Sequence, residues 1–163
     1  MALAAAWFAS MAGCGSRQQA PAQQARTPQT QYQRIAIVCA PAAGANAKYA
    51  AVILDQAKAE ANKVLGPYLK AADCLPDVAV DTTSTPPKAD LGARAADYDA
   101  VCCLTYSHGG GKATLDFYVL DVKSGASVWT YKLDTADPDT HRRLSRHGHY
   151  VPAILKHEFY RFK

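Results

Sequence analysis

The chain has 163 residues and a net charge of +4 at neutral pH, with 20% charged and 49% hydrophobic residues. This length allows one domain of ordinary size with a single hydrophobic core. No nucleic-acid-binding module is recognisable and the net charge is modest, so composition and motifs exclude nucleic acid as an expected partner.

The chain starts with a short apolar run that ends in small residues before a cysteine. Ala2–Gly13 carries no charged side chain, and the first basic residue is Arg17. A membrane-spanning helix needs about 20 apolar residues, so this run is too short to span a bilayer. A run of this length that ends in small residues is typical of a secretory signal peptide, although a basic residue normally precedes it.

The end of this run, Met11-Ala12-Gly13-Cys14, resembles the lipobox of bacterial lipoproteins. The resemblance implies that residues 1–13 are a signal peptide and that the Cys14 thiol takes a diacylglycerol thioether. Asp, the familiar signal for retention in the inner membrane, does not follow Cys14. The resemblance therefore implies a lipid anchor at the periplasmic face of the outer membrane.

Residues 14–33 are rich in Gln, Pro, Thr and Ala. Such a segment has little apolar surface to bury, so burial does not offset the entropy lost on ordering. We expect a flexible tether that reaches on the order of 20–30 Å. Together with Cys14, it would hold the following domain close to a membrane.

Residues 34–163 are expected to form a single α/β domain of about 130 residues. The apolar run Arg34–Ala40 predicts a strand buried on both faces. A helix should start near Gly44–Asn46 and end at Gly66–Pro67. A second strand is expected at Asp77–Asp81, which would complete a right-handed strand–helix–strand unit.

The second half of the domain is predicted to hold most of the sheet. Lys88–Ala96 is expected to be a short helix, and Ala100–Tyr106 a third strand. Lys112–Val122 alternates between apolar and polar residues and should form a hairpin with Ser127–Leu133. A helix interrupted by Pro152 follows from Thr140. The order strand–helix–strand–(helix)–strand–strand–strand–helix predicts an α/β sandwich, with a mixed sheet of about five strands covered by helices.

Part of this region resembles a recurring pattern of periplasmic lipoprotein domains. Tyr98-Asp99 opens an apolar strand, and Leu120-Asp121 precedes a turn with Gly125 and then Val128-Trp129. The pattern is similar to domains related to the N-terminal domain of the Tol translocation protein and to the curli-secretion lipoprotein. This resemblance implies a binding or assembly module without catalytic activity, and it assigns no functional residue.

Ser107–Gly111 is expected to be a loop, and His108, Gly109, Gly110, Gly111 and Lys112 form a candidate ligand loop. Three glycines permit close backbone approach to a ligand. A phosphate-binding P-loop requires Gly where Tyr106 stands, and a helix where a strand is predicted. A flexible strand connection is the alternative interpretation of this segment.

The C-terminal segment combines histidines with basic residues. His141, His147 and His149 are candidate metal ligands, although no recognised metal motif has this spacing. Residues 141–163 hold six Lys or Arg side chains and one Glu. A basic patch for anionic lipid, cell-wall polymer or an acidic partner would include Arg142, Arg143 and Arg146. The alternative is a solvated helix face.

Four cysteines fall in the domain, namely Cys39, Cys74, Cys102 and Cys103. An oxidising compartment would allow disulfides among them, but buried free thiols are also common. Cys102 and Cys103 are adjacent, so they should point to opposite faces of a strand.

Three functions follow as hypotheses. The first is a lipid-anchored, non-catalytic envelope protein that binds another envelope protein and needs no cofactor. The second is a periplasmic metal- or redox-active protein that uses the histidines or the domain cysteines. The third is a small hydrolase built from Cys103, Ser107, His108 and Asp116, for which no nucleophile motif exists.

Overall fold

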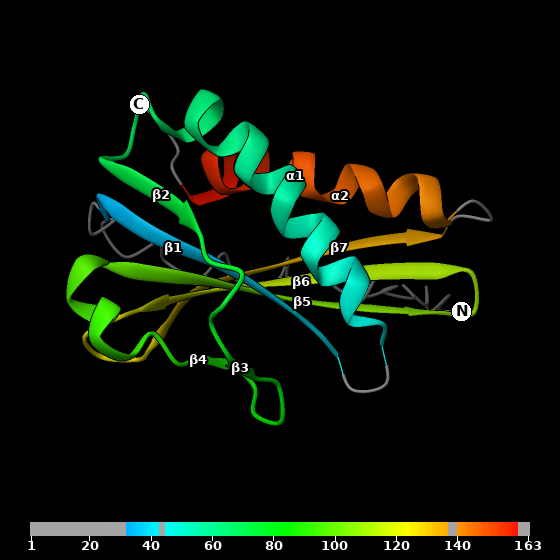
Figure 1. Ribbon diagram of the computed structural model, residues 1–163, viewed down its shortest axis with the longest axis horizontal. Helices are drawn as coiled ribbons and strands as arrows, with labels where there is room; N and C mark the ends of the chain where they lie inside the picture. The colour runs from blue at the N-terminus through cyan, green and yellow to red at the C-terminus, as the bar shows by residue number, and fades with distance from the viewer. Residues whose placement is uncertain (1–31, 43–44, 137–139, 160–163) are drawn as a thin grey trace, which may run out of the picture. The chain divides into compact units, whose positions relative to one another are not determined.

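The structure is a computed structural model that describes residues 32–42, 45–136 and 140–159 (Figure 1). The predicted signal peptide, Cys14 and residues 15–31 of the predicted tether lie outside the described residues. The last two residues of the segment predicted as tether, Tyr32 and Gln33, belong to the folded domain instead, because Tyr32 is buried in the main core and Gln33 is hydrogen-bonded to Asp99. The domain that follows has the predicted α/β fold, with one five-stranded mixed sheet. In spatial order its strands are β2 (Ala71–Cys74), β1 (Arg34–Pro41), β5 (Ala100–Gly109), β6 (Lys112–Asp121) and β7 (Ser127–Ala136).

The sheet divides into a parallel half and an antiparallel half. β1 pairs in parallel with both β2 and β5, whereas β5, β6 and β7 form an antiparallel meander. β1 therefore lies inside the sheet between two parallel neighbours, which explains its continuous apolar sequence. β2 and β7 are the two edges of this sheet.

Two helices cover the same face of the sheet (Figure 1). α1 (Ala47–Leu65) begins where the Asn46 side chain accepts a hydrogen bond from the Lys48 backbone N–H at 2.9 Å. It ends at Gly66, which confirms both predicted boundaries. α2 (Thr140–Ile154) runs through Pro152 and continues as a π-helix, η2 (Leu155–Phe159). The helical turns shift from α to π within three residues of Pro152, which lacks the N–H that an α-helical hydrogen bond requires.

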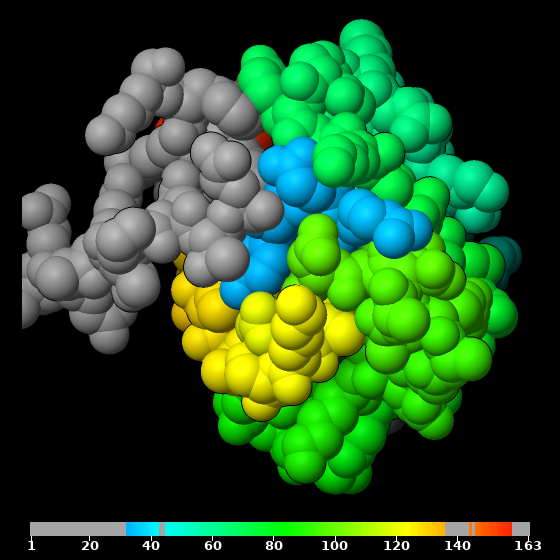
Figure 2. Space-filling view, turned by 90° about the vertical axis from the view of Figure 1, so that its left-hand side faces the viewer, coloured from blue at the N-terminus to red at the C-terminus, as the bar shows by residue number. Residues whose placement is uncertain are grey.

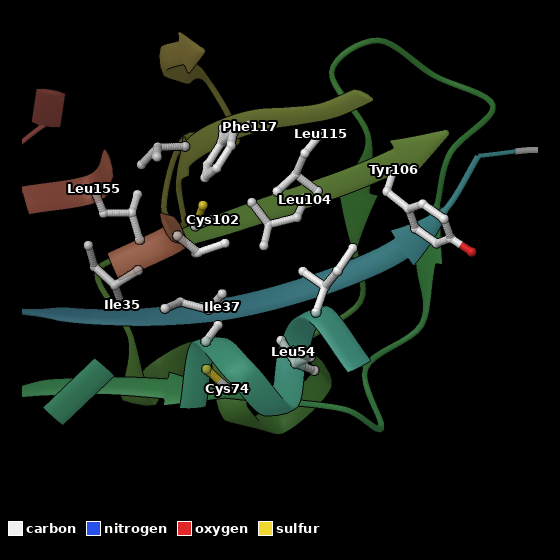
Figure 3. Close-up of a cluster of buried hydrophobic side chains, with 14 of the residues drawn as sticks. Ile35, Ile37, Leu54, Cys74, Cys102, Leu104, Tyr106, Leu115, Phe117 and Leu155 are labelled. Atoms are coloured by element: carbon white, nitrogen blue, oxygen red, sulfur yellow. The ribbon is translucent and has the colours of Figure 1, made fainter. Parts of the chain in front are cut away.

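The predicted alternation of β6 places its apolar residues under these helices. Leu115, Phe117 and Val119 are fully buried in the main core. Figure 3 shows Leu115 and Phe117 beside Leu104 and Cys102 of β5. Trp129 and Tyr131 of β7 are half-buried, stack with ring centroids 5.8 Å apart, and pack against the edge of this core.

The opposite face of the sheet holds a second, smaller apolar cluster. It consists of Ala36, Val38, Val78, Leu91, Val101, Cys103 and Leu120. The segment between β2 and β5 covers this cluster and contains β3 (Val80–Asp81), β4 (Lys88–Ala89) and the 3-10 helix η1 (Gly92–Asp97).

The second strand of the predicted strand–helix–strand unit was placed wrongly at Asp77–Asp81. The partner of β1 is β2, at Ala71–Cys74, and Val80–Asp81 instead pairs with β4 in a separate two-stranded sheet. β2 escapes prediction because its short sequence AADC has no run of β-branched or aromatic residues. The apolar Val78 caps the second cluster.

The helix predicted at Lys88–Ala96 was also wrong in its first half. Lys88–Ala89 is the strand β4, and the helical turns start only at Gly92. The Asp90 side chain accepts a hydrogen bond from the Gly92 N–H at 3.1 Å, and Gly92 has a φ of +53°. This turn separates the strand from the short helix, because a positive φ is incompatible with a continuous right-handed helix.

Candidate functional site

A set of hydrogen bonds holds the backbone where β1 begins. The Asp99 carboxylate accepts hydrogen bonds from the backbone N–H groups of Gln33 and Arg34, both at 3.0 Å. In return, the Asp99 N–H donates to the Arg34 carbonyl at 2.8 Å. The start of β1 is thereby fixed to the start of β5.

A second carboxylate holds the residue just before these. The Tyr32 hydroxyl donates to Asp121 at 3.1 Å, and Asp121 also accepts hydrogen bonds from the N–H and hydroxyl of Ser124 at 2.8 Å. Burial and the neighbouring Asp121 raise the pKa of Tyr32 to about 12. The hydrogen bond from the Ser124 N–H is the largest cause that lowers the pKa of Asp121, and the hydrogen bond from the Ser124 hydroxyl is the second. Asp121 is therefore a charged acceptor at neutral pH.

We call Tyr32, Gln33, Arg34, Asp99 and Asp121 the N-terminal clamp. Figure 2 shows the start of β1, in blue, beside the yellow turn between β6 and β7. Asp99 and Asp121 belong to the lipoprotein-like pattern found in the sequence, and in the structure both accept hydrogen bonds from Tyr32, Gln33 or Arg34 at this end of the sheet. Sequence reasoning found the two aspartates but not their partners, which lie 66 and 89 residues away.

The candidate ligand loop forms a tight hairpin. The prediction of a loop at Ser107–Gly111 was wrong, because β5 continues to Gly109 and β6 begins at Lys112. Only Gly110 and Gly111 form the turn, with φ values of +59° and +74°. Positive φ at both central residues defines a type I′ turn, which suits glycine and matches the twist of the strands. These glycines are therefore explained by backbone conformation.

The flanking residues of this hairpin point in different directions. His108 lies on the helix-covered side, where its ring is 6.4 Å from that of Tyr49. Ser107 precedes it on the same strand and so faces the opposite side. The Ser107–His108 pair of the hydrolase hypothesis is thus not brought together. Lys112 pairs with Gly109 beside the turn and is exposed.

The predicted histidine cluster also separates. His147 is only 2% exposed and shares a buried stripe of α2 with Leu144 and Val151. His149 is exposed, and its Nδ1 lies 3.9 Å from a carboxylate oxygen of Glu60 on α1. The side chain of His141 lies outside the described side chains. Among the residues that the structure describes, no group of three or more His, Cys, Asp or Glu side chains could hold a metal ion.

Gly148, between those histidines, is a helix-packing residue. A methyl group on its Cα would collide with the Ile53 carbonyl oxygen and with Cβ of Gln56, both on α1. Gly148 is therefore the point where α2 packs closely against α1. Of its two neighbours in the sequence, His147 is buried and His149 is exposed.

The basic patch is described only in part. Arg146 is exposed on α2, whereas the side chains of Arg142 and Arg143 lie outside the described ones. The patch remains a prediction.

The four domain cysteines are free thiols. Cys102 lies in the main core and Cys103 in the second cluster, which confirms that the two point to opposite faces. Burial raises the pKa of Cys74 and of Cys103 to about 12, and that of Cys102 well above its ordinary value. Because the thiolate is the reactive form, these three thiols are protonated and unreactive at neutral pH.

On β6 and β7, the sheet face opposite the helices is polar outside the second cluster. On β6 and β7, the residues that face away from the helices include Thr114, Asp116, Thr130, Lys132 and Asp134. Asp116 lies opposite Lys132, and Thr114 lies opposite Asp134. Burial raises the pKa of Asp116, Lys132 opposes this shift, and Asp134 adds to it. We call these five residues the polar sheet face.

No family model matches the sequence, and no curated relative matches it. Solved structures with similar folds include TolB from Acinetobacter baumannii, at 15% identity and a TM-score of 0.47. The match covers 78% of this chain but only 28% of the TolB chain. The lipoprotein GNA1162 from Neisseria meningitidis matches at 12% identity over 77% of this chain and 95% of its own, with a TM-score of 0.44.

A further similar structure is a putative neuraminyllactose-binding hemagglutinin homolog from Helicobacter pylori. It is 8% identical over 86% of this chain and 91% of its own, with a TM-score of 0.46. The structural neighbours thus include a lipoprotein. A likeness of this degree does not extend to function.

Proposed function

We propose that this protein is a lipid-anchored, non-catalytic lipoprotein of the bacterial envelope that acts as a binding or assembly module. The observation that carries the proposal is Met11-Ala12-Gly13-Cys14 at the end of an uncharged apolar run. A lipid on Cys14 and the burial-poor segment that follows it would together form a membrane tether.

The N-terminal clamp supports this role. A tethered domain is pulled at the point where the tether joins it, and here that point is held by two carboxylates. β1 runs away from the clamp, and β5 lies parallel to it, so the Gly110–Gly111 hairpin is at the opposite end of the sheet. The tether anchored at Cys14 would therefore join the domain at the end of the sheet opposite that hairpin.

No helix in the described part of the chain is long and apolar enough to span a bilayer.

The proposal of a non-catalytic module is supported by the placement of the candidate nucleophiles. Ser107 and His108 face opposite sides of β5, and burial holds the Cys103 thiol in its protonated form. The metal- or redox-active alternative gains no specific support, because His147 is buried while His149 faces Glu60 at the surface.

The first test is the chemical state of the N-terminus. The chain would be expressed with its own N-terminal segment in a Gram-negative host, and the N-terminal peptide analysed by mass spectrometry. We expect a diacylglyceryl peptide that begins at Cys14 in the membrane fraction. Cys14→Ser should remove the lipid and leave the membrane-bound form depleted, whereas the neighbouring Ser16→Ala should change neither.

Two further outcomes refine or reject the proposal. Gly15→Asp should move the protein from outer-membrane to inner-membrane fractions on a density gradient, because Asp after the lipidated cysteine is the familiar retention signal. An unmodified peptide that starts at Met1, found in the soluble fraction, would reject the anchor. With the anchor established, crosslinking in intact cells would identify the envelope partner.

A further inference from the structure

We propose that two copies of this chain pair antiparallel through the edge strand β7, centred on Leu133, to form one continuous ten-stranded sheet. β7 is ten residues long, and among the described residues only β6 pairs with it. Thr130, Lys132 and Asp134 are exposed along it, and Val128 is 44% exposed. A long open edge exposes a row of backbone hydrogen-bonding groups that another strand can satisfy.

The register of the sheet shows which backbone groups of β7 are open. Gly109 and Lys112 flank a two-residue turn and so form a hydrogen-bonded pair. Alternation then directs the N–H and C=O groups of the odd-numbered residues of β6 toward β7. The bond from the Asp121 N–H to the Ala126 carbonyl, at 2.9 Å, agrees with this assignment.

On β7, the residues opposite these odd-numbered positions are Trp129, Tyr131, Leu133 and Thr135. Their backbone groups are used by β6. The N–H and C=O groups of Thr130, Lys132 and Asp134 consequently point out of the sheet edge. A second strand would pair with these three residues.

The bulge in β7 limits where a second strand can pair. The register between β6 and β7 shifts between Val119 and Leu120, which leaves Val128 without an opposite residue. A bulge bends its strand and disrupts regular pairing. The regular part of the open edge is therefore 129–136. An antiparallel pair centred on Leu133 uses 130–136, whereas one centred on Tyr131 would extend into the bulge.

Charge selects the same register. Around Leu133, the Lys132 of each copy lies opposite Asp134 of the second copy, and this pair occurs twice by symmetry. Lys132 already lies opposite Asp116 across β6 and β7. Across the joined sheet, Asp116 and Lys132 of one copy and Asp134 of the second copy then lie side by side in one row, and their charges alternate in sign. A register centred on Lys132 would instead place the two lysines face to face, which is unfavourable.

Apolar packing is compatible with this pairing. Leu133 is half-buried on the helix-covered side and packs against the main core. In the dimer, the two Leu133 side chains meet at the two-fold axis as a non-hydrogen-bonded pair, in which side chains approach most closely. The cores of the two copies would touch there, and the two polar sheet faces would join into one surface.

Cysteine crosslinking of the full-length chain tests this geometry. In a non-hydrogen-bonded antiparallel pair the two Cα atoms are about 4.5 Å apart, within the range that a disulfide spans. Leu133→Cys should therefore give a disulfide-linked dimer on non-reducing gels after membranes and soluble fraction are treated with copper–phenanthroline. The matched control is Tyr131→Cys, on the same face of the strand. Its two copies would be offset by four residues, or about 13 Å, and should stay unlinked.

Charge reversal provides a second, independent measurement. Asp134→Lys places lysines opposite each other twice, and should raise the dimer dissociation constant of the detergent-solubilised full-length chain roughly tenfold in sedimentation experiments. Adding Lys132→Asp and Asp116→Lys to the same chain reverses all three charges of each row, which keeps opposite charges paired both within each copy and between copies, and should restore the dimer to near its original affinity.

Three results would overturn the proposal. One is a chain that stays monomeric at high concentration with no crosslink at Leu133. Another is a crosslink at Tyr131 but not at Leu133, which indicates a different register. The third is equal dissociation constants for the parent chain and Asp134→Lys. None of these readouts depends on Cys14, so they are separable from the test of the lipid anchor.

Discussion

The carboxylate of Asp99 accepts a hydrogen bond from the backbone N–H of Arg34 at 3.0 Å, although 65 residues separate them. The same oxygen accepts the Gln33 N–H at 3.0 Å. Asp99→Ala leaves both donors without this acceptor at the start of β1. We expect the free energy of unfolding to fall by about 2 kcal/mol, measured by urea denaturation.

Asp97→Ala is the matched control for Asp99. Asp97 is exposed and forms a 3.8 Å ion pair with Arg34. Surface pairs of this kind contribute little, so we expect a change of less than about 0.5 kcal/mol. Equal effects of the two substitutions would show that the N-terminal clamp does not hold β1.

Tyr106 is expected to respond to substitution in the opposite sense. Its side chain is 1% exposed, and its hydroxyl has no hydrogen-bond partner among the described residues. Figure 3 shows this hydroxyl at the end of the apolar cluster, turned away from Leu104. Tyr106→Phe removes a polar group that is buried without compensation, so we expect the free energy of unfolding to rise by about 1 kcal/mol.

The comparison for Tyr106 is Tyr98→Phe. The Tyr98 hydroxyl donates to Asp73 at 3.0 Å. Its removal should lower the free energy of unfolding by about 0.5–1 kcal/mol. A loss of stability in Tyr106→Phe would mean that its hydroxyl has a partner in the folded protein.

The elements that the sequence predicted well are those whose signal is local. β1 is a continuous apolar run because it is buried on both faces. β6 alternates between apolar and polar residues because its helix-covered face is more deeply buried than the other. Asn46 and Gly66 mark the ends of α1 by their own chemistry. β2 was missed because only its pairing with β1 makes Ala71–Cys74 a strand.

The candidate site was harder to predict because its residues act over long sequence separations. Asp99 and Asp121 stood out as part of a lipoprotein-like pattern, but no sequence rule connects them to Arg34 or Tyr32. The bounds of the loop at Ser107–Gly111 were predicted wrongly for the converse reason, whereas its role as a ligand-contact site stays a prediction. Two glycines with positive φ form a tight turn as readily as a ligand-binding loop.

Gly148 is expected to be sensitive to the smallest possible side chain. A Cβ there would collide with the Ile53 carbonyl and the Gln56 side chain, so the two helices would have to move apart. We expect Gly148→Ala to lower the free energy of unfolding by about 1–3 kcal/mol. Arg146→Ala, at an exposed position on the same helix, should change it by less than about 0.5 kcal/mol. Similar values for both would show that α1 and α2 do not pack closely at Gly148.

The buried thiols predict a loss of stability in alkaline solution. Burial raises the pKa of Cys103 to about 12 in the folded protein, whereas a cysteine thiol in the unfolded chain has a pKa of about 8.5. Between these values only the unfolded chain releases the proton. The contribution of this thiol to stability is therefore complete below about pH 8.5, and it is lost as the pH rises toward the folded pKa.

Urea denaturation between pH 9 and 10.5 measures this effect. Cys103 should contribute about 1 kcal/mol of lost stability per pH unit in this window. In Cys103→Ala the free energy of unfolding should consequently fall less steeply with pH, even though the variant starts from a lower value at pH 7.5. Ser107→Ala, at an exposed position on the same strand, should keep the slope of the parent chain. Equal slopes in Cys103→Ala and the parent chain would show that this thiol ionises as easily in the folded state as in the unfolded one.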